Sequence, residues 1–84
     1  MEKAITFACP EEVLLTLTLS PEAFAQEVRL LAALKLYEQG RLSSGLAAKL
    51  AGLPRVHFLF TLGEHRIPLL TDTDEEFRRE WEHA

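Results

Sequence analysis

The first residues of the chain alternate between two kinds of side chain. In residues 3–10, KAITFACP, the side chains of Ile5, Phe7 and Cys9 would share one face of a strand, because successive side chains of a strand point to opposite faces. The pattern predicts a short N-terminal strand that ends at Pro10. The opposite face carries Ala4, Thr6 and Ala8. Two such strands, paired across a dimer, could enter the major groove of DNA, but we rank this mode of DNA binding below a helix-turn-helix.

Two helices are predicted after this strand. Residues 11–19, EEVLLTLTL, begin with Glu11 and Glu12, which favour a helix N-terminus, although Thr16 and Thr18 leave a strand as an alternative. Ser20 and Pro21 then suit the N-cap and the first position of a helix that runs to Tyr37 or Glu38, with Gly40 near its C-cap. Apolar residues cover more than one side of this long helix. We therefore expect it to lie in the core of a homodimer, the alternative being the core of a monomer.

The next segment has the pattern of a helix-turn-helix. Serines at 43 and 44 can cap a helix over residues 44–51, and Gly52 permits the left-handed backbone of a sharp turn. Pro54 suits the first turn of a second helix over about residues 54–62, which we expect to end at Gly63. Phe58 and Leu62 fit its buried face. A corner of two helices without DNA-binding activity would have the same pattern.

The C-terminal residues differ from the rest in pattern. Residues 64–76 indicate a loop or short strand in which Ile67, Leu69 and Leu70 are candidates for docking. The last helix is predicted within DEEFRREWEHA, and its apolar stripe consists of Phe77 and Trp81. So short a helix is marginal alone, and aromatic and arginine side chains are common interface anchors. We expect residues 71–84 to form a partner-binding arm through Phe77, Arg78, Arg79 and Trp81. Docking of this arm on its own domain is the alternative.

Composition narrows the class of protein. Eighty-four residues allow one small domain, and the single cysteine excludes an intrachain disulfide and a cysteine-rich zinc site. No apolar run is long enough for a membrane span and no signal-peptide core follows Lys3, so a cytoplasmic location is expected. The three histidines lack a metal-ligand spacing and no glycine-rich phosphate loop occurs. We therefore expect neither a catalytic site nor a cofactor.

Charge is distributed unevenly along the chain. The net charge is −4, but residues 41–70 carry four basic side chains against Glu64 alone, whereas the segments on either side are acidic. This segment coincides with the helix-turn-helix pattern, which makes its basic residues the candidate DNA contacts. They are Arg41, Lys49, Arg55 and Arg66. The apolar run VHFLF, residues 56–60, lies where a DNA-reading helix normally carries polar side chains. The alternative is therefore a protein-interaction or structural module that keeps the helix-turn-helix shape without binding DNA.

The chain resembles a family of small prokaryotic proteins, the uncharacterised protein family UPF0175. The resemblance covers nearly the whole chain, and its most specific pieces are EVRLLAALKLYEQGRLSSGLAAKLAGL and the later RIP. It implies an antitoxin with a helix-turn-helix that binds a PIN-domain ribonuclease toxin and its own promoter DNA. The expected architecture is mainly α, with a short N-terminal strand and a helix-turn-helix-like pair in a homodimer. A dimerisation and helix-turn-helix-like domain would span residues 1–70.

Overall fold

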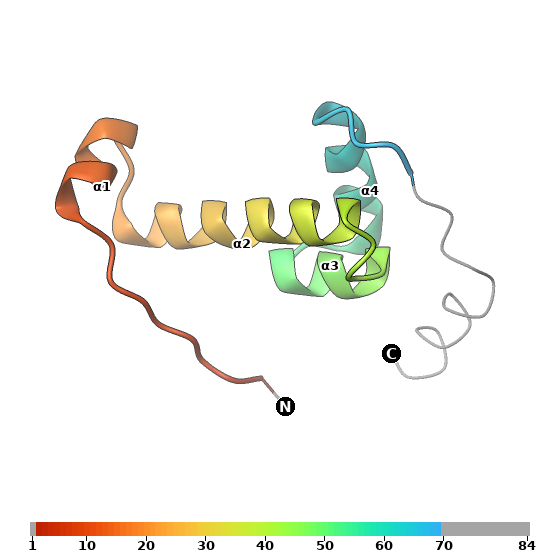
Figure 1. Cartoon of the computed structure of the whole chain (residues 1–84), viewed down its shortest axis with the longest axis horizontal. Coiled ribbons are helices and arrows are strands. Elements are labelled where there is room, and N and C mark those ends of the chain that lie inside the picture. Colours follow the sequence, from red (N-terminus) through yellow and green to blue (C-terminus); the bar gives the residue numbers. More distant parts are fainter. Residues whose placement is uncertain (1, 70–84) are drawn as a thin grey trace.

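Four helices follow one another in the part of the chain that the structure describes, and their boundaries reflect local sequence signals. The structure is a computed structural model that describes residues 2–69. The helices are α1 (Glu11–Leu17), α2 (Pro21–Glu38), α3 (Ser44–Ala51) and α4 (Arg55–Glu64). The prediction of a mainly α-helical protein is confirmed for these residues. In Figure 1, the long α2 links α1 at one end to the α3–α4 pair at the other.

The ends of α2 and α3 show the expected capping. The Ser20 hydroxyl accepts a hydrogen bond from the Ala23 amide at 3.1 Å, and the Ser43 hydroxyl accepts one from the Leu46 amide at 3.3 Å. These side chains satisfy amides that have no partner inside the helix. Beyond α2, the Arg41 amide donates to the Leu36 carbonyl at 2.9 Å and Gly40 has a φ of 73°. The chain therefore turns sharply into α3.

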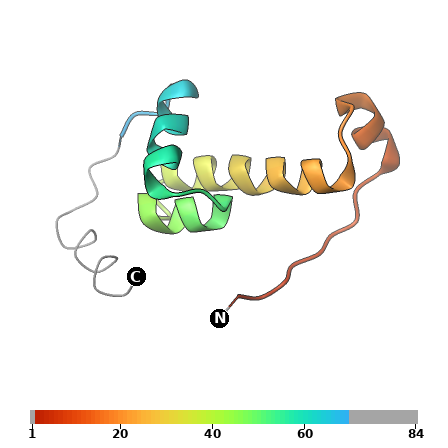
Figure 2. The same cartoon turned by 180° about the vertical axis from the view of Figure 1, so that it is seen from behind.

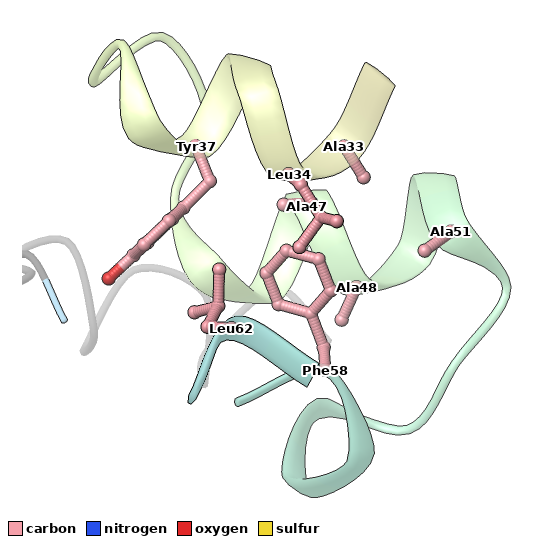
Figure 3. Close-up of a cluster of buried hydrophobic side chains, with 8 residues drawn as sticks. All are labelled: Ala33, Leu34, Tyr37, Ala47, Ala48, Ala51, Phe58 and Leu62. Carbon is pink, nitrogen blue, oxygen red and sulfur yellow. The ribbon is translucent and has the colours of Figure 1, made fainter. Parts of the chain in front are cut away.

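One small core joins α2, α3 and α4. The Phe58 ring of α4 lies between the other two helices, edge-on to the Tyr37 ring of α2, with the centroids 6.0 Å apart (Figure 3). Small side chains on α3 allow this close approach, since a larger side chain would hold the helices apart. The buried apolar residues are Ala33, Leu34, Tyr37, Ala47, Ala48, Ala51, Phe58 and Leu62. Phe58 and Leu62 are the residues expected on the buried face of the last helix.

The expected N-terminal strand is not formed within the described residues, and the expected end of the last helix is wrong. Residues 3–10 form no strand with any other described residue; they run apart from the helices, as Figures 1 and 2 show from opposite sides. A strand needs a neighbour for its backbone hydrogen bonds, and the described chain provides none. Gly63 does not end the last helix, which continues to Glu64. The boundary of this helix is set instead by Arg66, whose φ of 57° turns the chain so that Ile67 packs against the core.

Candidate nucleic-acid interface

The turn between α3 and α4 has the form expected of a helix-turn-helix. Gly52 has a φ of 73°, and the Leu53 amide donates to the Ala48 carbonyl at 3.0 Å, which closes the C-terminus of α3. Pro54 follows as the N-cap of α4. Phe58, one turn into α4, then packs on the alanines of α3, so the angle between the two helices is fixed by buried contacts.

A pair of polar side chains from α2 fixes the end of α3. The Gln26 Nε2 donates to the Ala51 carbonyl at 2.9 Å, and the Arg29 Nε donates to the Leu50 carbonyl at 2.8 Å. The last carbonyls of a helix lack partners within it, and a positive charge there also interacts favourably with the helix dipole. Gln26 and Arg29 therefore hold the helix-turn-helix on the long helix. Their sequence positions gave no signal for this role, because each contact spans more than 20 residues.

Arg55, one of the predicted DNA contacts, binds inside the protein. Its Nε donates to the Ser44 hydroxyl at 3.1 Å, and Ser44 is fully buried at the start of α3. The bond joins the first residue of α4 to the first residue of α3. Arg55 thus has a structural role in setting the helix pair, and its guanidinium lies partly buried. Sequence reasoning assigned Ser44 only as a cap and missed this contact.

The other three predicted DNA contacts lie on the surface but in different places. Arg41 is exposed in the turn before α3, Lys49 is exposed on α3, and Arg66 is exposed just beyond α4. A ten-residue helix is about 15 Å long. Arg66 and Arg55 therefore lie at opposite ends of α4, and the positive charge is spread along the helix pair rather than gathered in one cluster.

The outer face of α4 is apolar. Val56 is 75% exposed and Phe60 is 73% exposed, and they lie four residues apart on one face of the helix. Leu59, the residue before Phe60, packs partly buried against the core. Leu46 of α3 is 49% exposed. In a helix-turn-helix this second helix enters the major groove, where such side chains can contact thymine methyl groups but can donate no hydrogen bond to a base.

The other features considered in the sequence are partner-binding residues, a metal site and a membrane span. The predicted partner-binding residues Phe77, Arg78, Arg79 and Trp81 lie outside the described residues. Within residues 2–69, no cluster of three histidine, cysteine or acidic side chains could hold a metal ion. A search of the same residues finds no helix with the length and apolar character needed to cross a membrane.

Comparisons with known proteins identify the family. A model of the uncharacterised protein family UPF0175 matches residues 1–84. A UPF0175 protein of Archaeoglobus fulgidus is 36% identical over 61 residues, which cover 73% of this chain and 70% of that protein. No solved structure matches the chain. Since the family model spans the full sequence and the archaeal relative covers most of it, the chain belongs to the uncharacterised protein family UPF0175.

Proposed function

We propose that this protein is an antitoxin-like member of a type II toxin–antitoxin pair, which acts as a homodimer, binds a PIN-domain ribonuclease toxin and binds its own promoter DNA. The observation that carries the proposal is the helix-turn-helix geometry of α3 and α4. Gly52 forms its turn, Phe58 fixes its angle, and Gln26 and Arg29 join it to α2. A rigid helix pair of this kind is one of the common ways in which a regulator fits the major groove of its promoter.

The distribution of charge on this helix pair favours contacts with phosphates over contacts with bases. Arg41, Lys49 and Arg66 are exposed along it, and basic side chains of this kind supply sequence-independent affinity that falls steeply with salt. Arg55 lies at the start of α4, where its fixed position would orient the helix on the DNA phosphate backbone. Val56 and Phe60 add only apolar contacts. We therefore expect DNA binding of low sequence specificity.

The toxin-binding part of the proposal concerns residues 71–84. The eight buried apolar residues lie between Ala33 and Leu62, and among residues 2–69 Ile67 is the last side chain that packs against them. A PIN-domain nuclease has an acidic metal site. Arg78 or Arg79 would enter that site in place of the metal, with Phe77 and Trp81 as apolar anchors.

A second candidate function rests on the apolar outer face of α4. Exposed apolar side chains that neighbour one another are typical of protein interfaces. The high exposure of Val56 and Phe60, together with the internal hydrogen bond of Arg55, favours a protein-interaction module that keeps the helix-turn-helix shape without binding DNA.

Gel shifts with the DNA upstream of the gene, run over a range of salt concentrations, separate the two functions. Lys49→Ala should weaken binding and lower the magnitude of the salt slope by about one unit, because one phosphate contact is lost. Lys35→Ala is the matched control, since Lys35 is an exposed α2 lysine whose ammonium pairs with Glu38 at 3.0 Å. It should leave the slope unchanged. No binding by the wild-type protein at low salt would contradict the DNA-binding proposal and favour the interaction module.

A further inference from the structure

The N-terminal third of the chain contributes no fully buried residue to the described core, and its Leu30 only packs partly buried against it. No residue from 2 to 32 is buried, and the first buried residue is Ala33, about two-thirds of the way along α2. Helix α1 has seven residues and buries none of them, and its Leu15 and Leu17 are 70% and 50% exposed. A helix of two turns is unstable in water without packing contacts. Something outside the described residues therefore has to cover this part of the molecule.

Residues 3–9 have the properties of an unpaired strand. Ile5 is 87% exposed and Phe7 is 62% exposed, and they lie on the same face of the extended segment. None of these seven residues forms a backbone hydrogen bond with another described residue. An extended segment with free amides and carbonyls is a template for pairing with another chain. The opposite face has only Ala4, Thr6 and Ala8, whose small side chains fit close packing.

We propose that residues 3–9 pair with the same residues of a second copy of this chain, in an antiparallel two-stranded ribbon centred on Thr6. In this register all seven residues find a partner before Pro10, which has no amide hydrogen, ends the pairing. Ile5 of each copy lies opposite Phe7 of the other, so four large apolar side chains form one face. Aromatic and β-branched pairs of this kind stabilise antiparallel strands.

Two observations favour a second copy over another partner. A two-fold axis brings the same surface of both subunits together, so that surface has to be complementary to itself. The sequence around Thr6 meets this requirement, because Ala4 lies opposite Ala8 and Ile5 lies opposite Phe7. A standard interface uses about 20–30 residues from each partner, which is the size of the unburied segment 2–32.

This inference gives a structure to the homodimer of the proposed function, but its test uses neither DNA nor a toxin. Single cysteines placed in a Cys9→Ser background report the register. Thr6→Cys puts the two thiols directly opposite each other, about 4.5–5.5 Å apart between Cα atoms, within reach of a disulfide. Ala4→Cys and Ala8→Cys lie on the same face, but each is about 14 Å from its own copy, four residues along the ribbon.

Under mild oxidation, Thr6→Cys should convert to a covalent dimer at least tenfold faster than Ala4→Cys, Ala8→Cys and the exposed control Gln39→Cys. Faster cross-linking at position 4 or 8 would overturn the register, and equal rates at all four positions would overturn the ribbon. If only the DNA-binding proposal were wrong, the cross-linking rates would stay as expected here and only the gel shifts with DNA would fail.

Sedimentation equilibrium provides the second measurement. The wild-type chain should sediment as a dimer of two 9.5 kDa subunits at micromolar concentration. Phe7→Asp should raise the dimer dissociation constant at least 100-fold, since it places a charge in the apolar face of the ribbon. Phe60→Asp is the matched control, because Phe60 is at least as exposed as Phe7 but lies on α4, and it should change the constant less than threefold. A monomeric wild-type chain, or equal effects of the two substitutions, would refute the proposal.

Discussion

Two glycines with the same backbone conformation give a controlled test of how α2 holds the helix-turn-helix. Gly40 and Gly52 both have a φ of 73°, but their surroundings differ. A Cβ at position 40 would meet nothing within 4 Å, whereas a Cβ at position 52 would lie 3.2 Å from Nη2 of Arg29. An alanine in the left-handed region costs roughly 1–2 kcal/mol of folding free energy. Part of this cost is offset, because alanine lowers the conformational entropy of the unfolded chain and so stabilises the fold by about 0.4–1 kcal/mol. Gly40→Ala should therefore destabilise the fold by about 1 kcal/mol.

Gly52→Ala should cost about 1 kcal/mol more than Gly40→Ala. The new methyl group displaces the guanidinium of Arg29, which is the end of a flexible side chain and moves more easily than the helices. The guanidinium has to shift by a few tenths of an ångström, which strains the 2.8 Å hydrogen bond from Arg29 to the Leu50 carbonyl and favours its loss. A hydrogen bond of this kind contributes about 1 kcal/mol when its donor is exposed. For a domain of this size the additional loss lowers the melting temperature by roughly 4–8 °C.

Urea unfolding followed by circular dichroism measures these differences, and a double-mutant cycle assigns them. In an Arg29→Ala background the two glycine substitutions should destabilise the fold equally, since only the cost of an alanine in the left-handed conformation remains. Equal costs of Gly40→Ala and Gly52→Ala in the wild-type background would refute the proposed role of Arg29. So would an excess cost at position 52 that persists without Arg29.

Three further predictions concern the core, α4 and the C-terminal segment. Phe58→Ala removes a fully buried ring and should cost about 3–5 kcal/mol, enough to unfold so small a domain, as circular dichroism at 25 °C would show. Gly63→Ala should stabilise the protein by up to about 1 kcal/mol in urea unfolding, because Gly63 is helical and a Cβ there meets nothing within 4 Å. A chain that ends at residue 71 should keep its melting temperature within a few degrees and its dimeric state, but lose toxin binding in calorimetry.

Local signals in the sequence were sufficient to predict α2, α3 and the turn at Gly52. Ser20 and Pro21 define the start of α2, and the glycines at 40 and 52 lie where the backbone reverses. These features depend on residues within a few positions of each other, so their physical basis is visible in the sequence. The same holds for Phe58 and Leu62, whose spacing of four residues places them on one face of α4.

The features that sequence reasoning missed depend on distant residues. The contacts of Gln26 and Arg29 with the end of α3 join positions 25 and 21 residues apart, and no local pattern indicates them. The end of α4 was misplaced because Gly63 is disfavoured in a helix by only about 1 kcal/mol, which the packing of Leu62 and Ile67 outweighs. The strand at residues 3–10 was predicted from alternation alone, which indicates a suitable surface but cannot supply the partner that a strand requires.

The most direct test of the antitoxin proposal is inhibition of a toxin. The proposal requires a PIN-domain ribonuclease gene beside this one; that ribonuclease would be purified, and its cleavage of RNA measured with increasing amounts of this protein. The proposal predicts complete inhibition near one equivalent of antitoxin-like chain, and loss of that inhibition when Arg78 and Arg79 are both changed to alanine. Undiminished RNA cleavage at a tenfold excess of the wild-type protein would contradict it.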